Sequence, residues 1–178
     1  MFKILNQKNH IKVTYAMLMA LTGTLEAEKE YIFTTPLEHG LSYKLVNHNS
    51  PLLMKKLGEN FEHIQKSIVK SNCSDIYDAE DIVKRVLNKQ SDLWVSTDSD
   101  NNTKGVLVIG FGQMPKGRII GAEAMGGKFD FNVITPVIAD YYKKLGFKFF
   151  EMTGRKGWEK IMEPLGYEFK TITLRKKL

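Results

Sequence analysis

The stretch GVLVIGFGQMPKGRIIGAEAMGG, residues 105–127, decides the fold of this chain. It holds two apolar runs, 105–111 and 118–125, which a Pro-Lys-Gly turn separates. An earlier apolar run, 93–96, is linked to them by the polar hexapeptide 98–103. Links this short join antiparallel strands, whereas a parallel connection needs a dozen or more residues. The stretch therefore predicts an antiparallel meander of three strands.

Two amphipathic helices are predicted before this meander. One buried face of a helix over residues 52–70 is indicated by apolar residues at helical spacing: Leu53, Leu57, Phe61, Ile64 and Ile68. Further along, Asp78 is a good N-cap residue with Asp81 three positions later. The apolar stripe that follows predicts a second helix over residues 79–87.

Helices and strands alternate after the meander. Apolar spacing predicts a helix over residues 134–145, with Pro136 in its first turn and Gly146 at its C-terminal cap. The remaining predicted elements are a strand, a short helix and a closing strand, over residues 147–152, 157–165 and 169–174. This order, two helices, a meander and then helix-strand-helix-strand, predicts an α/β domain of the α+β type.

The first 41 residues differ from the rest. Residues 11–25 are densely apolar, an acidic stretch follows, and residues 34–40 contain turn formers typical of a linker. We therefore expect an N-terminal extension or docking arm over 1–41 and a main domain over 42–178. The apolar arm must be covered, either by its own domain or by another protein subunit. Its longest apolar run, 15–21, is too short to cross a bilayer, which needs about 20 residues.

Composition limits the other classes of function. The single cysteine, Cys73, excludes an intramolecular disulfide framework and suits a cytoplasmic protein. The four histidines show no pairing typical of zinc ligands, so no metal site is expected. The net charge of +6 fits either a solvated surface or attraction to a polyanion, such as nucleic acid or a phosphorylated cofactor.

Three segments carry a resemblance to a known superfamily. The strand 118–125 runs into Gly126-Gly127 and a helix, the segment 139–147 reads ADYYKKLGF, and GRKGW at 154–158 precedes PLGYEF at 164–169. Together they resemble the GNAT acetyltransferases. The ending and Leu93-Trp94 are most similar to a divergent type common in bacteriophage genomes. The resemblance covers residues 44–178 and implies a GNAT-like fold.

This resemblance implies acetyl-CoA as the cofactor and names its site. In these enzymes the loop after the third meander strand binds the cofactor's pyrophosphate through backbone amides and the start of the next helix. The cofactor-binding candidates that it implies are Met125, Gly126, Gly127, Lys128 and Arg155. Glu123, on the strand before the loop, is the implied general base. The family's glycine spacing is absent, and Asp130 places a negative charge in the loop.

The tyrosine that can donate a proton in many members of the family is also replaced. Counting back from Gly166 puts Met162 where many members carry a tyrosine, and a thioether cannot donate a proton. Trp158 stands where a small residue is usual, and core packing explains both side chains better than ligand contact.

Three functions follow. The first is an N-acetyltransferase that acts on an amine. The second is an inert GNAT-like structural or interaction module, such as a bacteriophage virion component in the host cytoplasm or the virion, which would contact partner subunits through residues 1–41. The third, nucleic-acid binding, has only scattered support and is not expected: Lys143, Lys144 and Lys148 lie near Phe147.

Overall fold

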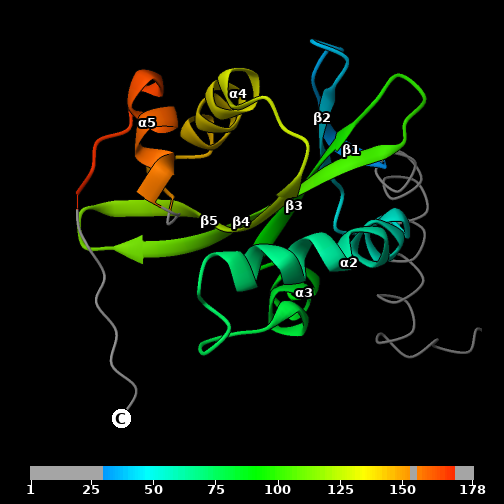
Figure 1. Cartoon of the computed structure of the whole chain (residues 1–178), viewed down its shortest axis with the longest axis horizontal. Coiled ribbons are helices and arrows are strands. Elements are labelled where there is room, and N and C mark those ends of the chain that lie inside the picture. Colours follow the sequence, from blue (N-terminus) through cyan, green and yellow to red (C-terminus); the bar gives the residue numbers. More distant parts are fainter. Residues whose placement is uncertain (1–29, 153–155, 171–178) are drawn as a thin grey trace, which may run out of the picture.

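A six-stranded sheet forms the centre of the molecule (Figure 1). The computed structural model describes residues 30–152 and 156–170 of the 178-residue chain. The strands are β1 (Tyr31–Thr34), β2 (Ser42–Val46), β3 (Ser91–Thr97), β4 (Thr103–Met114), β5 (Gly117–Gly127) and β6 (Phe147–Met152). They lie side by side in chain order; the first five pair antiparallel, and β6 pairs parallel with β5.

Helices cover both faces of this sheet. The helices α2 (Leu52–Lys70) and α3 (Ala79–Leu87) lie on one face, and α4 (Phe131–Lys144) lies on the other (Figure 1). The short α5 (Glu159–Met162), between two 3-10 turns, lies beside α4. Each face has its own hydrophobic core, since α2 and α3 pack on Val95, Val108 and their neighbours, and α4 packs on Trp94, Ile109 and theirs.

The two predicted helices α2 and α3 are confirmed. The predicted face of α2 packs on the sheet: Leu53, Leu57, Ile64 and Ile68 are buried, and Phe61 is partly buried. The N-terminus of α3 carries a capping box: the Asp81 N–H donates to the Asp78 carboxylate (3.0 Å), and the Asp78 N–H donates to the Asp81 carboxylate (3.2 Å). These bonds satisfy backbone donors that have no partner inside the helix.

The predicted order is wrong at its start, because two strands precede the helices. All five residues of β2 are buried, since the strand lies between β1 and β3 with helices on both faces. Such a strand shows no alternation of polar and apolar residues and is hard to distinguish from a loop. The other strand, β1, falls inside the predicted arm 1–41. Residues 1–29 of that arm lie outside the described residues, and the domain boundary stays a prediction.

Two predictions near the C-terminus also need correction. The helix α4 begins at Phe131, so Pro136 lies in its second turn and not in its first. Because proline has no backbone N–H, the Asn132 carbonyl lacks the donor that residue 136 would otherwise provide. The predicted closing strand is not found at Phe169 and Lys170, and its remaining residues, 171–174, lie outside the described part of the chain. The strand predicted over 147–152 is confirmed as β6, and the meander is confirmed as β3, β4 and β5.

Candidate functional site

An irregularity in β5 sets the position of Glu123. The pairs Val108–Ala124 and Ile109–Ala122 are consecutive along β4, so Glu123 is an extra residue in a β-bulge. Just before it lies Ala122, whose pair with Met152 is the last between β5 and β6 in the described part of the chain. Glu123 therefore lies directly after the described paired part of β5 and β6.

The Glu123 carboxylate is held by two neighbours. Its Oε1 lies 2.6 Å from Arg85 Nη2, at the end of α3, and its Oε2 accepts a hydrogen bond from Ser91 Oγ (2.6 Å). The side chain lies across Gly110 on β4, where a Cβ atom would overlap Glu123 Oε1. Both oxygens thus already bind groups of the chain, and an amine could approach this carboxylate only by sharing it with Arg85. The role of Glu123 as a general base stays a prediction.

The glycines after Glu123 are explained by packing within the chain. A Cβ atom on Gly126 would lie 2.8 Å from the His63 carbonyl oxygen, so only glycine lets α2 pack this closely on β5. At Gly127, φ is +84° and a Cβ atom would overlap the Lys104 carbonyl oxygen. These contacts account for the Gly-Gly pair without a ligand.

Backbone amides of the loop also have partners within the chain. The Met125 N–H donates to Ser67 Oγ (2.8 Å) on α2. Further on, the Lys128 N–H donates to the Lys104 carbonyl (2.8 Å), and the Lys128 carbonyl accepts from Ser96 Oγ (2.6 Å). The loop is thereby tied to α2, β3 and β4.

Asp130 completes this arrangement at the start of α4. Its N–H donates to the Tyr43 hydroxyl (2.7 Å), and its Oδ1 accepts from the Asn132 N–H (3.0 Å) as the N-cap of the helix. Its Oδ2 lies 2.8 Å from His39 Nδ1, and this hydrogen bond holds the pKa of the Asp130 carboxyl below its usual value. A carboxylate therefore occupies the positive end of the α4 dipole, where a bound phosphate would be stabilised in a site of this type.

The remaining side chains that the sequence singled out lie in solvent, in the packing around α5, or outside the described residues. Arg155 lies outside the described residues, and the Lys128 side chain is exposed to solvent. Met162 is 5% exposed, and the Trp158 ring packs edge-on against Phe131 at 5.6 Å between centroids. Both therefore act as packing residues, as predicted.

A buried polar chain on the α4 face was missed by sequence reasoning. The Trp94 Nε1–H donates to the Tyr142 hydroxyl (3.0 Å), which donates to Asp92 Oδ2 (2.6 Å). Behind it, His48 Nε2 lies 3.6 Å from Asp92 Oδ1. Burial raises the pKa of the Asp92 carboxyl and that of the Tyr142 hydroxyl. The available signal was an acidic residue beside the apolar run that starts at Leu93.

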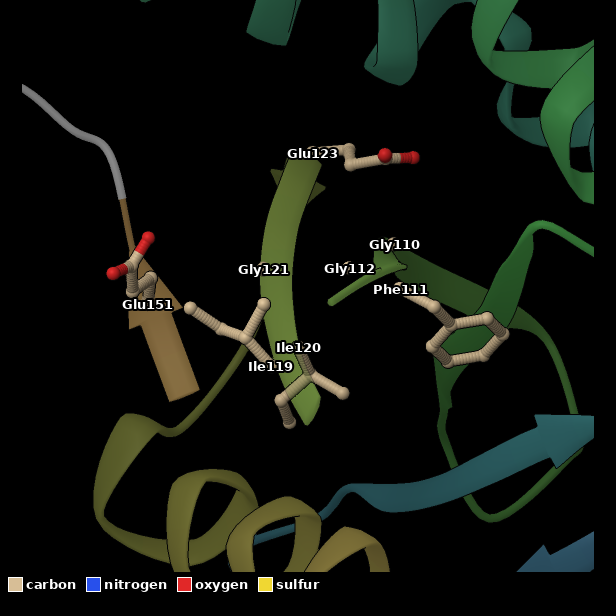
Figure 2. Close-up of a pocket in the computed structure, with 8 residues that line it drawn as sticks. All are labelled: Gly110, Phe111, Gly112, Ile119, Ile120, Gly121, Glu123 and Glu151. Atoms are coloured by element: carbon tan, nitrogen blue, oxygen red, sulfur yellow. The ribbon is translucent and has the colours of Figure 1, made fainter. Parts of the chain in front are cut away.

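An open hollow lies on the face of the sheet away from α4. It encloses about 180 Å³, and Gly110, Gly112 and Gly121 leave room for it because they carry no side chains. Figure 2 shows Glu123 on β5 and Glu151 on β6 at its two sides. A second hollow of about 340 Å³ shares Ile119 and Glu151 with the first, so the two form one groove along β5.

Comparison with solved structures identifies the fold. A predicted acetyltransferase from Clostridium acetobutylicum, solved with acetyl-CoA, has a TM-score of 0.56 and 11% identity, covering 77% of this chain and 96% of that chain. A Trypanosoma brucei acetyltransferase has a TM-score of 0.54 and 10% identity, with coverage of 78% and 99%. An aminoglycoside acetyltransferase from an uncultured soil sample, in complex with sisomicin, has a TM-score of 0.55 and 12% identity, with coverage of 80% and 99%.

These matches show a GNAT-like acetyltransferase fold and no more than the fold, because the identities are so low. The bacteriophage subtype has no support from them and stays a prediction. No protein-family model matches the chain, and no curated protein matches it significantly. Among the described residues, no helix is long and apolar enough to span a membrane, and no group of three or more metal-ligating side chains occurs.

Proposed function

We propose that this chain is an acetyltransferase-fold protein that acts by binding other molecules and does not transfer acetyl groups from acetyl-CoA. One observation carries the proposal: in the loop that would bind the cofactor's pyrophosphate, the amides of Met125, Lys128, Asp130 and Asn132 are hydrogen-bonded within the chain. A protein partner is the expected ligand class, and the segment before β1 is our candidate for contacting it.

The pyrophosphate does not fit the residues that are present. The amides of Met125, Lys128 and Asp130 already donate to Ser67, Lys104 and Tyr43, so a phosphate would have to displace these acceptors. The Asp130 carboxylate adds a negative charge at the helix end that would otherwise attract an anion. Displacing it would also break its contact with His39.

Thermal unfolding with and without acetyl-CoA tests this proposal. A ligand that binds only the folded state raises the melting temperature as its concentration exceeds Kd. We expect a shift of about 1 °C or less at millimolar acetyl-CoA. Isothermal titration would show whether any larger shift is saturable, and saturable binding with a micromolar Kd would contradict the proposal.

Acetyl transfer from acetyl-CoA to an amine is the second candidate, and one feature favours it. The last described pair between β5 and β6 is Ala122–Met152, so Glu123 lies directly after the paired part of β5, at the position where the superfamily resemblance places the cofactor. In this reading Glu123 is the base, and Met125, Gly126, Gly127, Lys128 and Arg155 surround acetyl-CoA. Release of free CoA from acetyl-CoA with a panel of primary amines tests it. Turnover that Glu123→Gln abolishes, while Glu151→Gln leaves it intact, would favour this candidate over the binding module.

A further inference from the structure

The topology brings two segments of the chain together at one end of the sheet. The strand β4 ends at Met114, and β5 starts there after a short turn. The strand β6 is parallel to β5 and starts at the same end, as the pair Arg118–Phe147 shows, so the C-terminal end of α4 arrives there too. We call the segments 112–119 and 143–149 the hairpin end; Figure 1 shows the β4–β5 turn at one extreme of the molecule.

Contacts hold these two segments side by side. Arg118 Nη1 donates to the Leu145 carbonyl (3.0 Å), and Arg118 Cζ lies 3.8 Å from the centre of the Phe147 ring. Lys148 lies against Gly117, where a Cβ atom would meet its Cδ at 2.6 Å. Neighbouring strands are about 4.8 Å apart, so the ends of β4, β5 and β6 lie within about 10 Å. This width is comparable with the Debye length of about 8 Å at physiological salt, so charges on the two segments act together.

The hairpin end is basic. Its two segments hold no carboxylate and five cations, which are Lys116, Arg118, Lys143, Lys144 and Lys148. Two carboxylates lie close by, since Asp140 pairs with Lys144 (2.7 Å) and Glu151 lines the hollow beside the β4–β5 turn. Within the described residues, the ammonium groups of the other three lysines have neither an ion pair nor a hydrogen bond. These three cations are therefore available to an external anion.

The loops at the opposite end of the sheet lack this excess of cations. They are residues 35–41, 98–102 and 128–130, and they hold four carboxylates and one lysine. Lys104, on β4 beside them, pairs with Asp98 (2.8 Å). The two ends of the sheet thus differ in charge, and such a molecule turns its basic end toward an extended anionic surface.

Apolar side chains protrude among the cations of the hairpin end. Met114 and Leu145, beside the two turns, are 46% and 50% exposed, and Phe149 is 47% exposed. Single-stranded nucleic acid is bound by aromatic rings on which bases stack, whereas the two side chains at the turns are aliphatic and Arg118 covers the ring of Phe147. Aliphatic side chains surrounded by cations fit the boundary between the phosphate headgroups and the acyl chains of a bilayer.

We infer that the hairpin end docks on the surface of a membrane that contains anionic lipids. Met114 and Leu145 insert at the level of the headgroups, and the surrounding cations bind lipid phosphates. The contact is peripheral, and the difference in charge between the two ends sets its orientation. It does not involve the loop before α4, so it holds whether or not the chain binds acetyl-CoA.

Sedimentation of the full chain with lipid vesicles tests this contact. One set of vesicles contains equal parts of phosphatidylcholine and phosphatidylserine, and a second set contains phosphatidylcholine alone. We expect binding to the first set only, and weaker binding as the salt concentration rises. Each cation beside an anionic leaflet strengthens binding about fivefold, so Lys116→Gln with Lys148→Gln should weaken it about 25-fold. Met114→Ser with Leu145→Ser should weaken it about tenfold or more, because apolar surface is no longer buried.

Two double variants of the same chemistry are matched controls. Lys55→Gln with Lys84→Gln removes two exposed charges from α2 and α3. Met54→Ser with Ile76→Ser removes exposed apolar side chains from α2 and from the loop after it. Both controls should bind the vesicles within about twofold of the wild type, because they leave the hairpin end intact. All four double variants change exposed side chains and should unfold near the wild-type temperature.

Each other outcome overturns the inference. Equal binding to both sets of vesicles means that charge has no part in the contact. Binding that the hairpin-end variants retain places the contact elsewhere in the chain, and an equal loss in the controls assigns it to total charge. No binding to phosphatidylserine vesicles at low salt removes the lipid surface as a partner. Binding of a single-stranded oligonucleotide that Lys116→Gln with Lys148→Gln abolishes, without vesicle binding, assigns the hairpin end to nucleic acid.

Discussion

Replacing Tyr142 by phenylalanine removes one oxygen atom from the buried chain that joins Trp94 to Asp92. The Trp94 N–H loses its acceptor and the Asp92 carboxylate loses a donor, both in a core where Trp94 and Tyr142 are almost wholly inaccessible to water. An unpaired buried donor costs about 1–3 kcal/mol, and a lost hydrogen bond to a charged group costs about 1.5–3 kcal/mol. We therefore expect Tyr142→Phe to lower the free energy of unfolding by about 3 kcal/mol. For a chain of this length, the melting temperature should fall by about 6–12 °C.

The loss should depend on pH. Burial raises the folded-state pKa of Asp92, while the Tyr142 hydrogen bond and the nearby His48 lower it. An acid whose pKa is raised on folding destabilises the fold above that pKa, and this penalty disappears as the pH falls through the folded-state pKa. Removing the Tyr142 hydroxyl removes a hydrogen bond that lowers the Asp92 pKa, so the cost of keeping this carboxylate ionised in the folded state becomes larger. The deficit of Tyr142→Phe should thus be greater near pH 7 than near pH 3, which lies below the ordinary Asp pKa of 3.8, so that a raised pKa leaves the carboxyl protonated there.

Chemical denaturation at the two pH values measures this deficit. Tyr141→Phe is the matched control, because its ring packs on Trp94 and Tyr142 while no hydrogen bond is found for its hydroxyl within the described residues. We expect the control to change the free energy of unfolding by less than about 1 kcal/mol. A Tyr142→Phe deficit that does not change with pH, or one that Tyr141→Phe reproduces, would refute the role of the hydroxyl.

Three further changes are predicted. Gly110→Ala should destabilise the fold by about 1–3 kcal/mol, because its Cβ atom displaces Glu123 from Arg85; Gly58→Ala on α2, where a Cβ atom meets nothing, should instead stabilise it slightly in the same melting experiment. Asp78→Ala should lower the melting temperature by a few degrees through loss of the capping box, and Asp78→Asn should retain most of it. Hydrogen bonding to Lys104 depresses the pKa of Asp98 to about 2, so its contribution to stability is present above pH 4 and disappears as the pH falls through about 2. In a plot of the free energy of unfolding against pH, Asp98→Asn should accordingly reduce the loss of stability at acid pH.

Sequence predicts best those elements in which buried and exposed residues alternate with one regular spacing. In α2 and α3 one face is buried and the other is solvated, so the apolar spacing marks both helices and the Asp78 cap marks a start. The strand β2 has no such contrast, because all five of its residues are buried. The sequence predicts the start of α4 three residues late, because the resemblance assigns Asp130 to a phosphate loop, whereas in the structure it is the N-cap of the helix.

For the candidate site, sequence could place the loop but not its partners. The segment from Glu123 to Lys128 lies where the resemblance put it, at the end of β5 before α4. Two hydrogen-bond partners of this segment and of Asp130 just after it, however, are Ser67 and Tyr43, which precede Met125 and Asp130 by 58 and 87 residues. Nothing local to those residues indicates a contact with the loop, since hydroxyl side chains serve equally well on a surface. The Arg85–Glu123 pair has the same origin in the tertiary fold.

The internal bonds of the loop also set how weakly it should bind acetyl-CoA. A Kd of about 1 µM corresponds to about −8.2 kcal/mol. Binding a pyrophosphate here would displace the partners of four amides, those of Met125, Lys128, Asp130 and Asn132. At about 1 kcal/mol each, this weakens binding about a thousandfold, to a Kd of about 1 mM.

The two affinities give clearly different melting shifts. With 1 mM ligand, a Kd of about 1 µM stabilises the fold by about 4.1 kcal/mol, whereas a Kd of about 1 mM adds only about 0.4 kcal/mol. At about 2–4 °C per kcal/mol, these values correspond to about 8–16 °C and about 1 °C. A shift of the larger size would mean that the loop opens at little energetic cost, so that the contacts of Asp130 with Tyr43 and His39 contribute almost nothing to stability. The double variant Tyr43→Phe with His39→Ala would then unfold at the wild-type temperature, which provides a check without any cofactor.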